Sequence, residues 1–189
     1  MYASNVKTQF RHYRKARICQ GDIFRDLDIA SGAPISAVEV DVEIESDSNY
    51  WIVINQDCDL NQDYKQRKEN KIRDDVNIRT ILICPAYPAR QFFAGDHIED
   101  WDLKSYGKKK IDKIKNNDEY KRYHYLEGNT SLGVPELVID FKHFYTIPVE
   151  TAYKQRLKSY LVTLNELHRE DLNQRFCSFL SRIGLPDSV

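Results

Sequence analysis

The sequence predicts an α+β fold, in which an antiparallel β-rich body over residues 18–148 is closed by a helical hairpin over residues 149–184. Two observations favour this fold. Short β-branched and aromatic runs separated by Gly, Pro, Asn and Ser fill the first part of the chain, as in strands and turns. Apolar residues then recur at intervals of three or four, as on one helix face. Because 189 residues suit one domain, we expect residues 149–189 to pack on residues 1–148.

The clearest strand predictions lie in the N-terminal half. Residues 20–24 indicate a turn that enters a strand, because Gly is followed by strand-forming Ile and Phe. Residues 35–45 alternate valine or isoleucine with acids, which predicts a half-buried strand with an acidic outer face. Residues 50–55 are an unbroken apolar run and predict a central strand buried on both faces. We expect residues 35–45 and 50–55 to form an antiparallel hairpin.

Further elements follow in the second part of the body. Residues 61–78 are polar and suit a loop or a surface helix. Residues 79–84 predict a strand that prolines at its end should stop. Residues 120–126 and 136–147 predict the last strands of the body, about five or six in all. The two prolines expected to end the strand over residues 79–84 are Pro85 and Pro88.

Between these strands, the charged segment 104–122 is interpreted as an insertion in the body. We expect three apolar residues before it, Ile98, Trp101 and Leu103, to anchor a short helix. Residues 104–115 would then form a solvated helix or loop.

Two apolar stripes predict the helices of the C-terminal hairpin. Asn165 is the expected cap between them, and Gly184 with Pro186 is a usual helix stop. The first stripe is Val149, Tyr153, Leu157, Tyr160, Leu161 and Leu164, and the second is Leu172, Phe176, Phe179, Leu180 and Ile183.

Composition excludes several classes of protein. The chain is 41% hydrophobic and 30% charged with few Gly and Pro, unlike collagenous or disordered chains. No apolar run approaches the roughly 18 residues of a membrane span, so we expect a soluble, cytoplasmic protein without membrane partners. The four cysteines are far apart and form no CxxC pair, which favours free thiols over a disulfide framework or a zinc knuckle. We expect neither a metal site nor a cofactor.

Charge is segregated along the chain, although the formal net charge is only −1. Residues 1–20 hold five basic residues and no acid, residues 22–63 hold eleven acids and one arginine, and residues 104–124 hold eight basic residues and three acids. Such blocks can bind phosphates or an oppositely charged partner. Alternatively, they are solvated faces that neutralise one another in the fold.

The densest polar group in the sequence follows the strand predicted over residues 50–55. Functional side chains often lie where a rigid strand ends, so Asp57, Cys58 and Asp59 are candidate catalytic residues. A calcium loop is disfavoured because its sixth and twelfth positions hold Gln62 and Lys68 in place of Gly and Glu. The Asp-x-Asp pattern after a strand resembles the haloacid-dehalogenase phosphohydrolases, but the β pattern around it does not alternate with helices.

A purely structural interpretation of the same residues stays open. Flanking acids discourage the Cys58 thiolate that a nucleophile needs. Asp57 and Asp59 would then cap a turn around a buried Cys58.

Other candidate residues lie further along the chain. His143 should share a strand face with Phe141 and Tyr145, where a histidine can perform acid/base chemistry or stack on a base. Arg79 is a second candidate for acid, base or phosphate contacts. A basic and aromatic set is typical of nucleic-acid binding by phosphate contacts and stacking; it comprises Lys108, Lys109, Lys110, Arg122 and Tyr123.

The succession of Gln20-Gly-Asp-Ile-Phe24, an acidic hairpin, Trp51-Ile-Val-Ile54 and Arg79-Thr-Ile-Leu-Ile83 resembles the opening of the MazF/PemK toxin family. The resemblance implies a small SH3-like antiparallel β-barrel that binds and cuts RNA without a metal, as a toxin–antitoxin or phage-defence component. The chain departs from the family where residues 55–59 replace a hydroxyl-bearing strand end. The Asp57-Cys-Asp-Leu60 run and the ending 182–186 also resemble an uncharacterised group of bacterial and phage-related proteins.

Two functional hypotheses follow. The first is a MazF-like protein that binds nucleic acid, RNA before DNA, and cleaves it as an endoribonuclease. The alternative is a non-enzymatic interaction or regulatory subunit of a bacterial conflict system, with a protein partner or a second copy of the chain on its helices. Burial of Leu180 and Ile183 within one monomer would contradict the helical version of this alternative.

Overall fold

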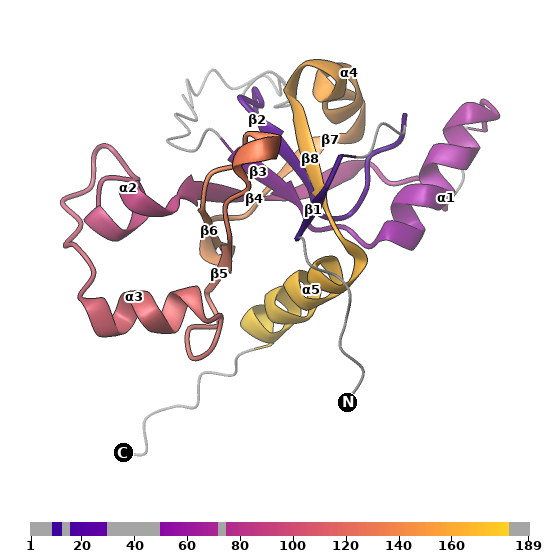
Figure 1. The fold of residues 1–189 in the computed structure, drawn as a ribbon. Coiled ribbons are helices and arrows are strands. Elements are labelled where there is room, and N and C mark those ends of the chain that lie inside the picture. Colours follow the sequence, from indigo (N-terminus) through magenta and orange to yellow (C-terminus); the bar gives the residue numbers. More distant parts are fainter. Residues whose placement is uncertain (1–8, 13–15, 30–49, 72–74, 182–189) are drawn as a thin grey trace, which may run out of the picture.

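The computed structural model describes residues 9–12, 16–29, 50–71 and 75–181. Over these residues the chain is an α+β domain with a strongly curled antiparallel sheet, a half-barrel, surrounded by helices (Figure 1). Its elements are β1 Phe10–Arg11, β2 Asp22–Arg25, β3 Tyr50–Val53, α1 Asp57–Lys68, β4 Thr80–Pro88, α2 Ala89–Ala94, α3 Lys108–Lys115, β5 Tyr123–Leu126, η2 Thr130–Leu132, β6 Leu137–Asp140, η3 Phe141–His143, β7 Tyr145–Pro148, α4 Val149–Ser159, β8 Tyr160–Leu164 and α5 Glu166–Leu180.

The strand order is β1-β8-β2-β3-β4-β6-β5, and β7 also pairs with β4. The predicted central strand is confirmed: β3 lies between β2 and β4. The hairpin partner predicted over residues 35–45 lies outside the described residues, and both neighbours of β3 are other strands. β4 continues through Pro85 to Pro88, contrary to the prediction. On this edge of β4, pairing with β7 ends at Ile83 and pairing with β6 begins at Ala86. Pro85 lies in the gap between these two ladders, where its missing N–H is tolerated.

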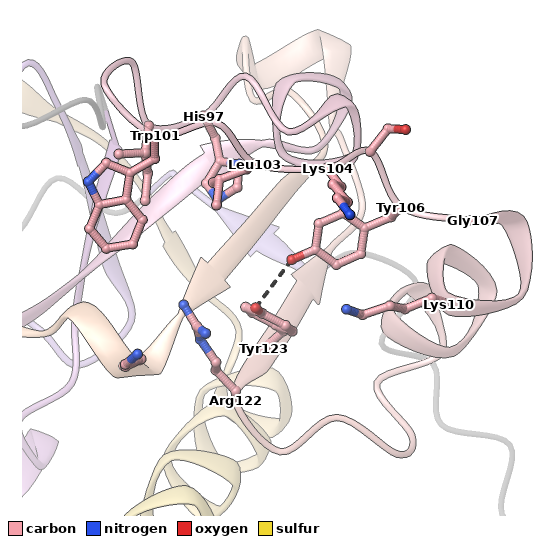
Figure 2. A pocket seen from close by; sticks show the side chains of 12 residues that line it. His97, Trp101, Leu103, Lys104, Tyr106, Gly107, Lys110, Arg122 and Tyr123 are labelled. Atoms are coloured by element: carbon pink, nitrogen blue, oxygen red, sulfur yellow. Dashed lines mark hydrogen bonds between the residues drawn. The ribbon is translucent and has the colours of Figure 1, made fainter.

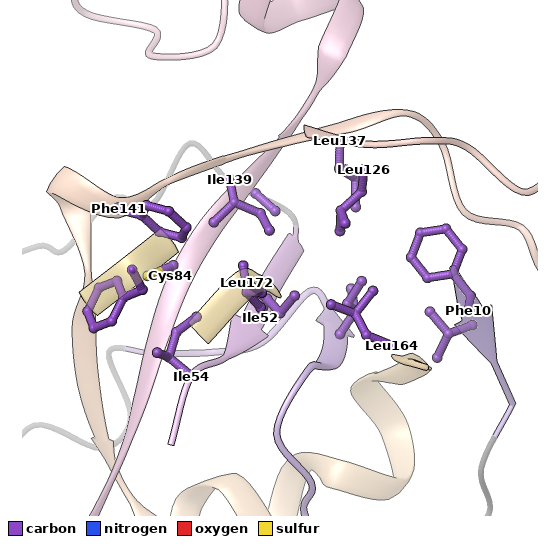
Figure 3. Packing of buried hydrophobic residues seen from close by; sticks show 14 of the residues in the cluster. Phe10, Ile52, Ile54, Cys84, Leu126, Leu137, Ile139, Phe141, Leu164 and Leu172 are labelled. Carbon is purple, nitrogen blue, oxygen red and sulfur yellow. The ribbon is translucent and has the colours of Figure 1, made fainter. Parts of the chain in front are cut away.

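The sheet is buried on both faces because its strands alternate between two apolar clusters. Ile52 and Cys84 pack against the buried face of α5, whereas Trp51 and Ile83 pack toward α4 and Leu60 of α1. Helices α5 and α4 therefore cover opposite sides of the sheet (Figure 1). The α5 cluster, drawn in Figure 3, contains Phe10, Ile23, Ile52, Ile54, Cys84, Ala86, Leu126, Val134, Leu137, Ile139, Phe141, Val162, Leu164, Leu172, Phe176 and Phe179.

The curl of the sheet brings its two edge strands toward each other. The Gln9 side chain, next to β1, accepts a hydrogen bond from the Glu127 amide just after β5 at 2.8 Å. The Gln9 carbonyl also accepts from the Asn165 amide at 2.8 Å, between β8 and α5. The Gln9 side chain thus connects β1 to the end of β5, with which β1 shares no backbone ladder, whereas the bond between the Asn165 amide and the Gln9 carbonyl extends the β1–β8 ladder.

The predicted C-terminal helical hairpin is wrong. Residues 149–180 form α4, β8 and α5, and β8 is inserted in the sheet between β1 and β2. Tyr160, Leu161 and Leu164 fit a helical stripe and a strand equally, but the β-branched Val162 and Thr163 between them favour extended backbone. The second predicted helix is confirmed as α5.

Three other expectations need correction. The residues interpreted as a turn around Cys58 are the first turn of α1. The helix before the charged segment forms earlier, at α2, and Trp101 remains 54% exposed. His143 lies in the short helix η3, not on a strand, because the Asp140 carboxylate accepts from the Lys142 amide at 3.0 Å and turns the chain.

A third cluster of apolar residues attaches α2 and α3 to the outer edge of the sheet. It contains Phe92, Ile114, Tyr123, Tyr125 and Val138, among others. Gly95 is required after α2, because it has φ +90° and an added Cβ would lie 2.4 Å from the Leu103 carbonyl oxygen. The loop that follows α2 is therefore held close to the helix.

Within the described ranges, no helix has the length and apolar character needed to cross a membrane.

We predict that Leu172→Ala lowers the free energy of unfolding by about 2–5 kcal/mol, because it leaves a cavity in the α5 cluster. Leu172 is 1% exposed. Leu167→Ala on the same helix is the matched control, because Leu167 is 58% exposed and such surface changes stay within about 0.5 kcal/mol. Urea denaturation measures both, and equal losses would contradict the assigned face of α5.

A second prediction concerns Asp22, which is fully buried and accepts a hydrogen bond from the Cys19 amide at 2.8 Å. Burial raises the pKa of Asp22 to about 7, whereas an unfolded aspartate titrates near pH 3.9. Between these two pH values Asp22 is protonated in the native state and ionised in the unfolded state. The free energy of unfolding should therefore fall as pH rises from about 4 to 7. We expect Asp22→Asn to flatten this slope in melting curves recorded from pH 5 to 7. A slope unchanged by the substitution would contradict the assignment.

Candidate functional site

A cavity of about 290 Å³ opens beside the third apolar cluster, between the loop after α2, α3, β5 and η3 (Figure 2). Its lining residues are His97, Ile98, Trp101, Leu103, Lys104, Ser105, Tyr106, Gly107, Lys110, Arg122, Tyr123 and Lys142. We call this the basic cavity.

The lining of the basic cavity contains four cationic side chains and no carboxylate. Lys104, Lys110 and Lys142 come from three different segments, the α2–α3 loop, α3 and η3. Arg122 precedes β5, and its Nε and Nη2 donate to the Asp140 carboxylate at 2.8 and 2.5 Å. Because Asp140 is fully buried behind the lining, it offsets part of the Arg122 charge and fixes the direction of the guanidinium.

Aromatic rings provide the remaining walls. The hydroxyls of Tyr106 and Tyr123 are 3.3 Å apart, and burial raises the pKa of Tyr123, which keeps its phenol neutral. The Lys110 ammonium lies 4.2 Å from the Tyr106 ring centre, and the Arg122 guanidinium lies 4.9 Å from that of Tyr123. Lys110 and Arg122 point toward the cavity from either side of Tyr123 (Figure 2). The exposed Trp101 contributes an apolar ring to this lining.

His143 lies beside this cavity without lining it. Its Nδ1 is 3.5 Å from Asp140 Oδ2, and its ring contacts the Trp101 ring edge-on at 5.9 Å between centres. Burial lowers the pKa of His143, with the Asp140 charge acting in the opposite sense. The imidazole is therefore neutral at pH 7, and it can accept a proton.

Two polar anchors fix the loop that leads to Arg122 and Tyr123. The Asn117 side chain accepts from the Tyr125 amide at 2.6 Å and donates to its carbonyl at 2.9 Å, so it substitutes for a neighbouring strand at the edge of β5. Arg175 of α5 donates to the carbonyls of Asn117, Tyr120 and Tyr123, the last at 2.8 Å. The helix that fills the core thus also positions the cavity wall.

Lys108 and Lys109 lie in the first turn of α3 and are exposed, outside the lining. Three successive lysines at a helix N-terminus oppose the helix dipole. This locally unfavourable placement concentrates positive charge in the first turn of α3, next to Lys110, which lines the basic cavity.

A second, polar cavity of about 700 Å³ lies at the N-terminus of α1. Its lining includes Asp57 and Cys58, and the other members are Arg17, Gln20, Gln56, Asn61, Arg169, Glu170 and Asn173. Asp57 accepts two hydrogen bonds from Arg17, at 2.9 and 2.8 Å, and one from the Gln20 amide at 3.2 Å. Burial opposes ionisation, but the bonds from Arg17 outweigh it and lower the pKa of Asp57.

The five candidate catalytic residues do not form one group. Asp57 and Cys58 share the polar cavity, His143 lies beside the basic cavity, and Asp59 and Arg79 are exposed and line neither. Cys58 is exposed, so its expected burial in a structural turn is wrong; its thiol lies 3.4 Å from Asp59 Oδ1.

Of the five predicted nucleic-acid contacts, the structure brings Lys110, Arg122 and Tyr123 together in one lining. Sequence reasoning did not single out Lys142 or Lys104, and it assigned Trp101 to a helix anchor. The lysine-rich block was a usable signal for Lys104, whereas Lys142 reaches the site only through the η3 turn.

Among the residues that the structure describes, no three His, Cys, Asp or Glu side chains gather as a metal-binding group.

No protein-family model matches the sequence, and no curated protein resembles it significantly.

We predict that Asp57→Asn destabilises the fold by about 1–3 kcal/mol, because it weakens charge-assisted hydrogen bonds from Arg17. Asp59→Asn is the matched control and should change stability by less than about 0.5 kcal/mol. Because the pKa of Asp57 is lowered in the native state, its contribution should be present above the unfolded value of about 3.9 and should disappear as pH falls below it. Chemical denaturation at pH 7 and pH 3 measures the free energy of unfolding of both variants. Equal losses for Asp57→Asn and Asp59→Asn at pH 7 would contradict a stabilising Asp57–Arg17 pair.

Proposed function

We propose that the protein binds single-stranded nucleic acid, RNA in preference to DNA, at the basic cavity. The observation that carries the proposal is the convergence of four cationic side chains and the Trp101, Tyr106 and Tyr123 rings in one lining without a carboxylate. Lysine and arginine bind phosphates, and aromatic rings stack on unpaired bases.

The exposure of Trp101 supports a single strand as the ligand. The Trp101 ring is 54% exposed, so the base of an unpaired nucleotide can reach it and stack on it. A duplex keeps its bases stacked inside and offers no such face.

The resemblance to the MazF/PemK toxins supports the RNA preference, and we infer that the curled sheet is a variant of their SH3-like barrel. On the same resemblance the proposal extends to RNA cleavage, as in a toxin or phage-defence component. His143 is the residue we assign to proton transfer, because it is neutral at pH 7 and is oriented by Asp140.

We predict that Trp101→Ala weakens binding of a labelled single-stranded RNA about 5- to 150-fold, since one stacked base contributes about 1–3 kcal/mol. Lys104→Gln with Lys110→Gln should reduce the slope of log Kd against log salt by about 1.4, because each phosphate contact on a single strand contributes about 0.7. Fluorescence anisotropy from 50 to 300 mM salt measures both effects.

Lys154→Gln with Lys158→Gln is the matched control, because both lysines are exposed on α4, away from the cavity. An equal loss of slope in this control would indicate a diffuse charge effect and contradict the site. Gel analysis of the same RNA, with and without chelator, reports cleavage, and His143→Gln should abolish any cleavage found.

A further inference from the structure

The size of the basic cavity limits how much of a strand it can hold. Its volume of about 290 Å³ is at the lower end of the roughly 300–1,000 Å³ found for small-molecule sites. This is room for one nucleotide with its phosphate. The cationic residues come from several segments and surround this one cavity.

The charge of the cavity exceeds what one internal phosphate requires. Lys104, Lys110 and Lys142 make no ion pair with a carboxylate of the described residues, whereas Arg122 is paired with Asp140. Three ammonium groups of the lining therefore have no carboxylate partner among the described residues. An internal phosphodiester carries one negative charge and would match one of them.

A phosphomonoester is a better match for this lining. It carries about −1.5 to −2 charges at pH 7 and offers three acceptor oxygens. Together with the next phosphodiester of the strand, it balances the three lysines. The Arg122 guanidinium can then contribute through Nη1, because its bonds to Asp140 use Nε and Nη2.

We infer that the basic cavity binds the phosphorylated end of a nucleic-acid strand, with the terminal phosphomonoester among Lys104, Lys110, Lys142 and Arg122 and the terminal base against Trp101. This inference rests on the proposed function. The chemistry is shared by a 5′-phosphate and a 3′-phosphate, so the test includes both.

The experiment compares five-nucleotide RNAs of one sequence that carry a fluorophore at one end and either phosphate or hydroxyl at the other. One pair varies the 5′ end and the second pair varies the 3′ end. We expect at least a tenfold lower Kd for the phosphorylated member of one pair, measured by anisotropy at pH 7.5. Because the second ionisation of a phosphomonoester lies near pH 6, this preference should shrink at pH 5.5.

Variants connect the preference to the cavity. Lys142→Gln should remove most of the preference while weakening the hydroxyl-ended RNA less, and Lys158→Gln should leave both unchanged. Binding with equal affinity for phosphate and hydroxyl ends would overturn the inference but leave the proposed function standing. Failure of every RNA to bind would overturn both the inference and the proposed function. A preference for phosphorylated ends that survives Lys104→Gln with Lys142→Gln would show that the phosphate binds outside the basic cavity.

Discussion

Burial of the sheet on both faces is the constraint on which the arrangement of this protein depends. Because β3 and β4 alternate between the α5 cluster and the α4 cluster, neither face has room for an uncompensated charge. Three carboxylates near the rim of the sheet each pair with an arginine, whereas the fully buried Asp22 of β2 makes no ion pair among the described residues and has a raised pKa. Asp63 pairs with Arg67, Asp57 with Arg17 and Asp140 with Arg122. Such pairs cost desolvation, but removing one partner leaves a buried charge, so they fix the rim segments in place.

The basic cavity is a consequence of this arrangement at one end of the sheet. α2 and α3 bury no part of the main clusters; they pack on Tyr123, Tyr125 and Val138 at the outer edge. Arg175 adds a polar connection to the core, because its guanidinium donates to the carbonyls of Tyr120, before β5, and of Tyr123, the first residue of β5. Repacking of α5 would thus displace the cavity wall as well as the core.

Strands with a continuous apolar run, such as β3, could be predicted from the sequence, as could α5 with its helical stripe. β8 was missed because Tyr160, Leu161 and Leu164 satisfy both periods; the β-branched Val162 and Thr163 and the pairing with β1 and β2 favour the strand. In the candidate site, Lys110, Arg122 and Tyr123 were visible within one basic and aromatic stretch. Lys142 and Trp101 were not, because the η3 turn and the loop held by Gly95 bring them there from a distance.

Asp140 shows how one carboxylate can organise a cationic site without neutralising it. It is fully buried, accepts from Arg122 and from the Lys142 amide, and lies 3.5 Å from His143. Its negative charge reduces the field of Arg122, yet its hydrogen bonds hold that guanidinium and η3 in fixed directions. The three lysines of the lining make no ion pair with a carboxylate of the described residues, and their side chains are flexible. A ligand would therefore be oriented by the rigid Arg122 and attracted by the mobile lysines, and these two effects act through different residues.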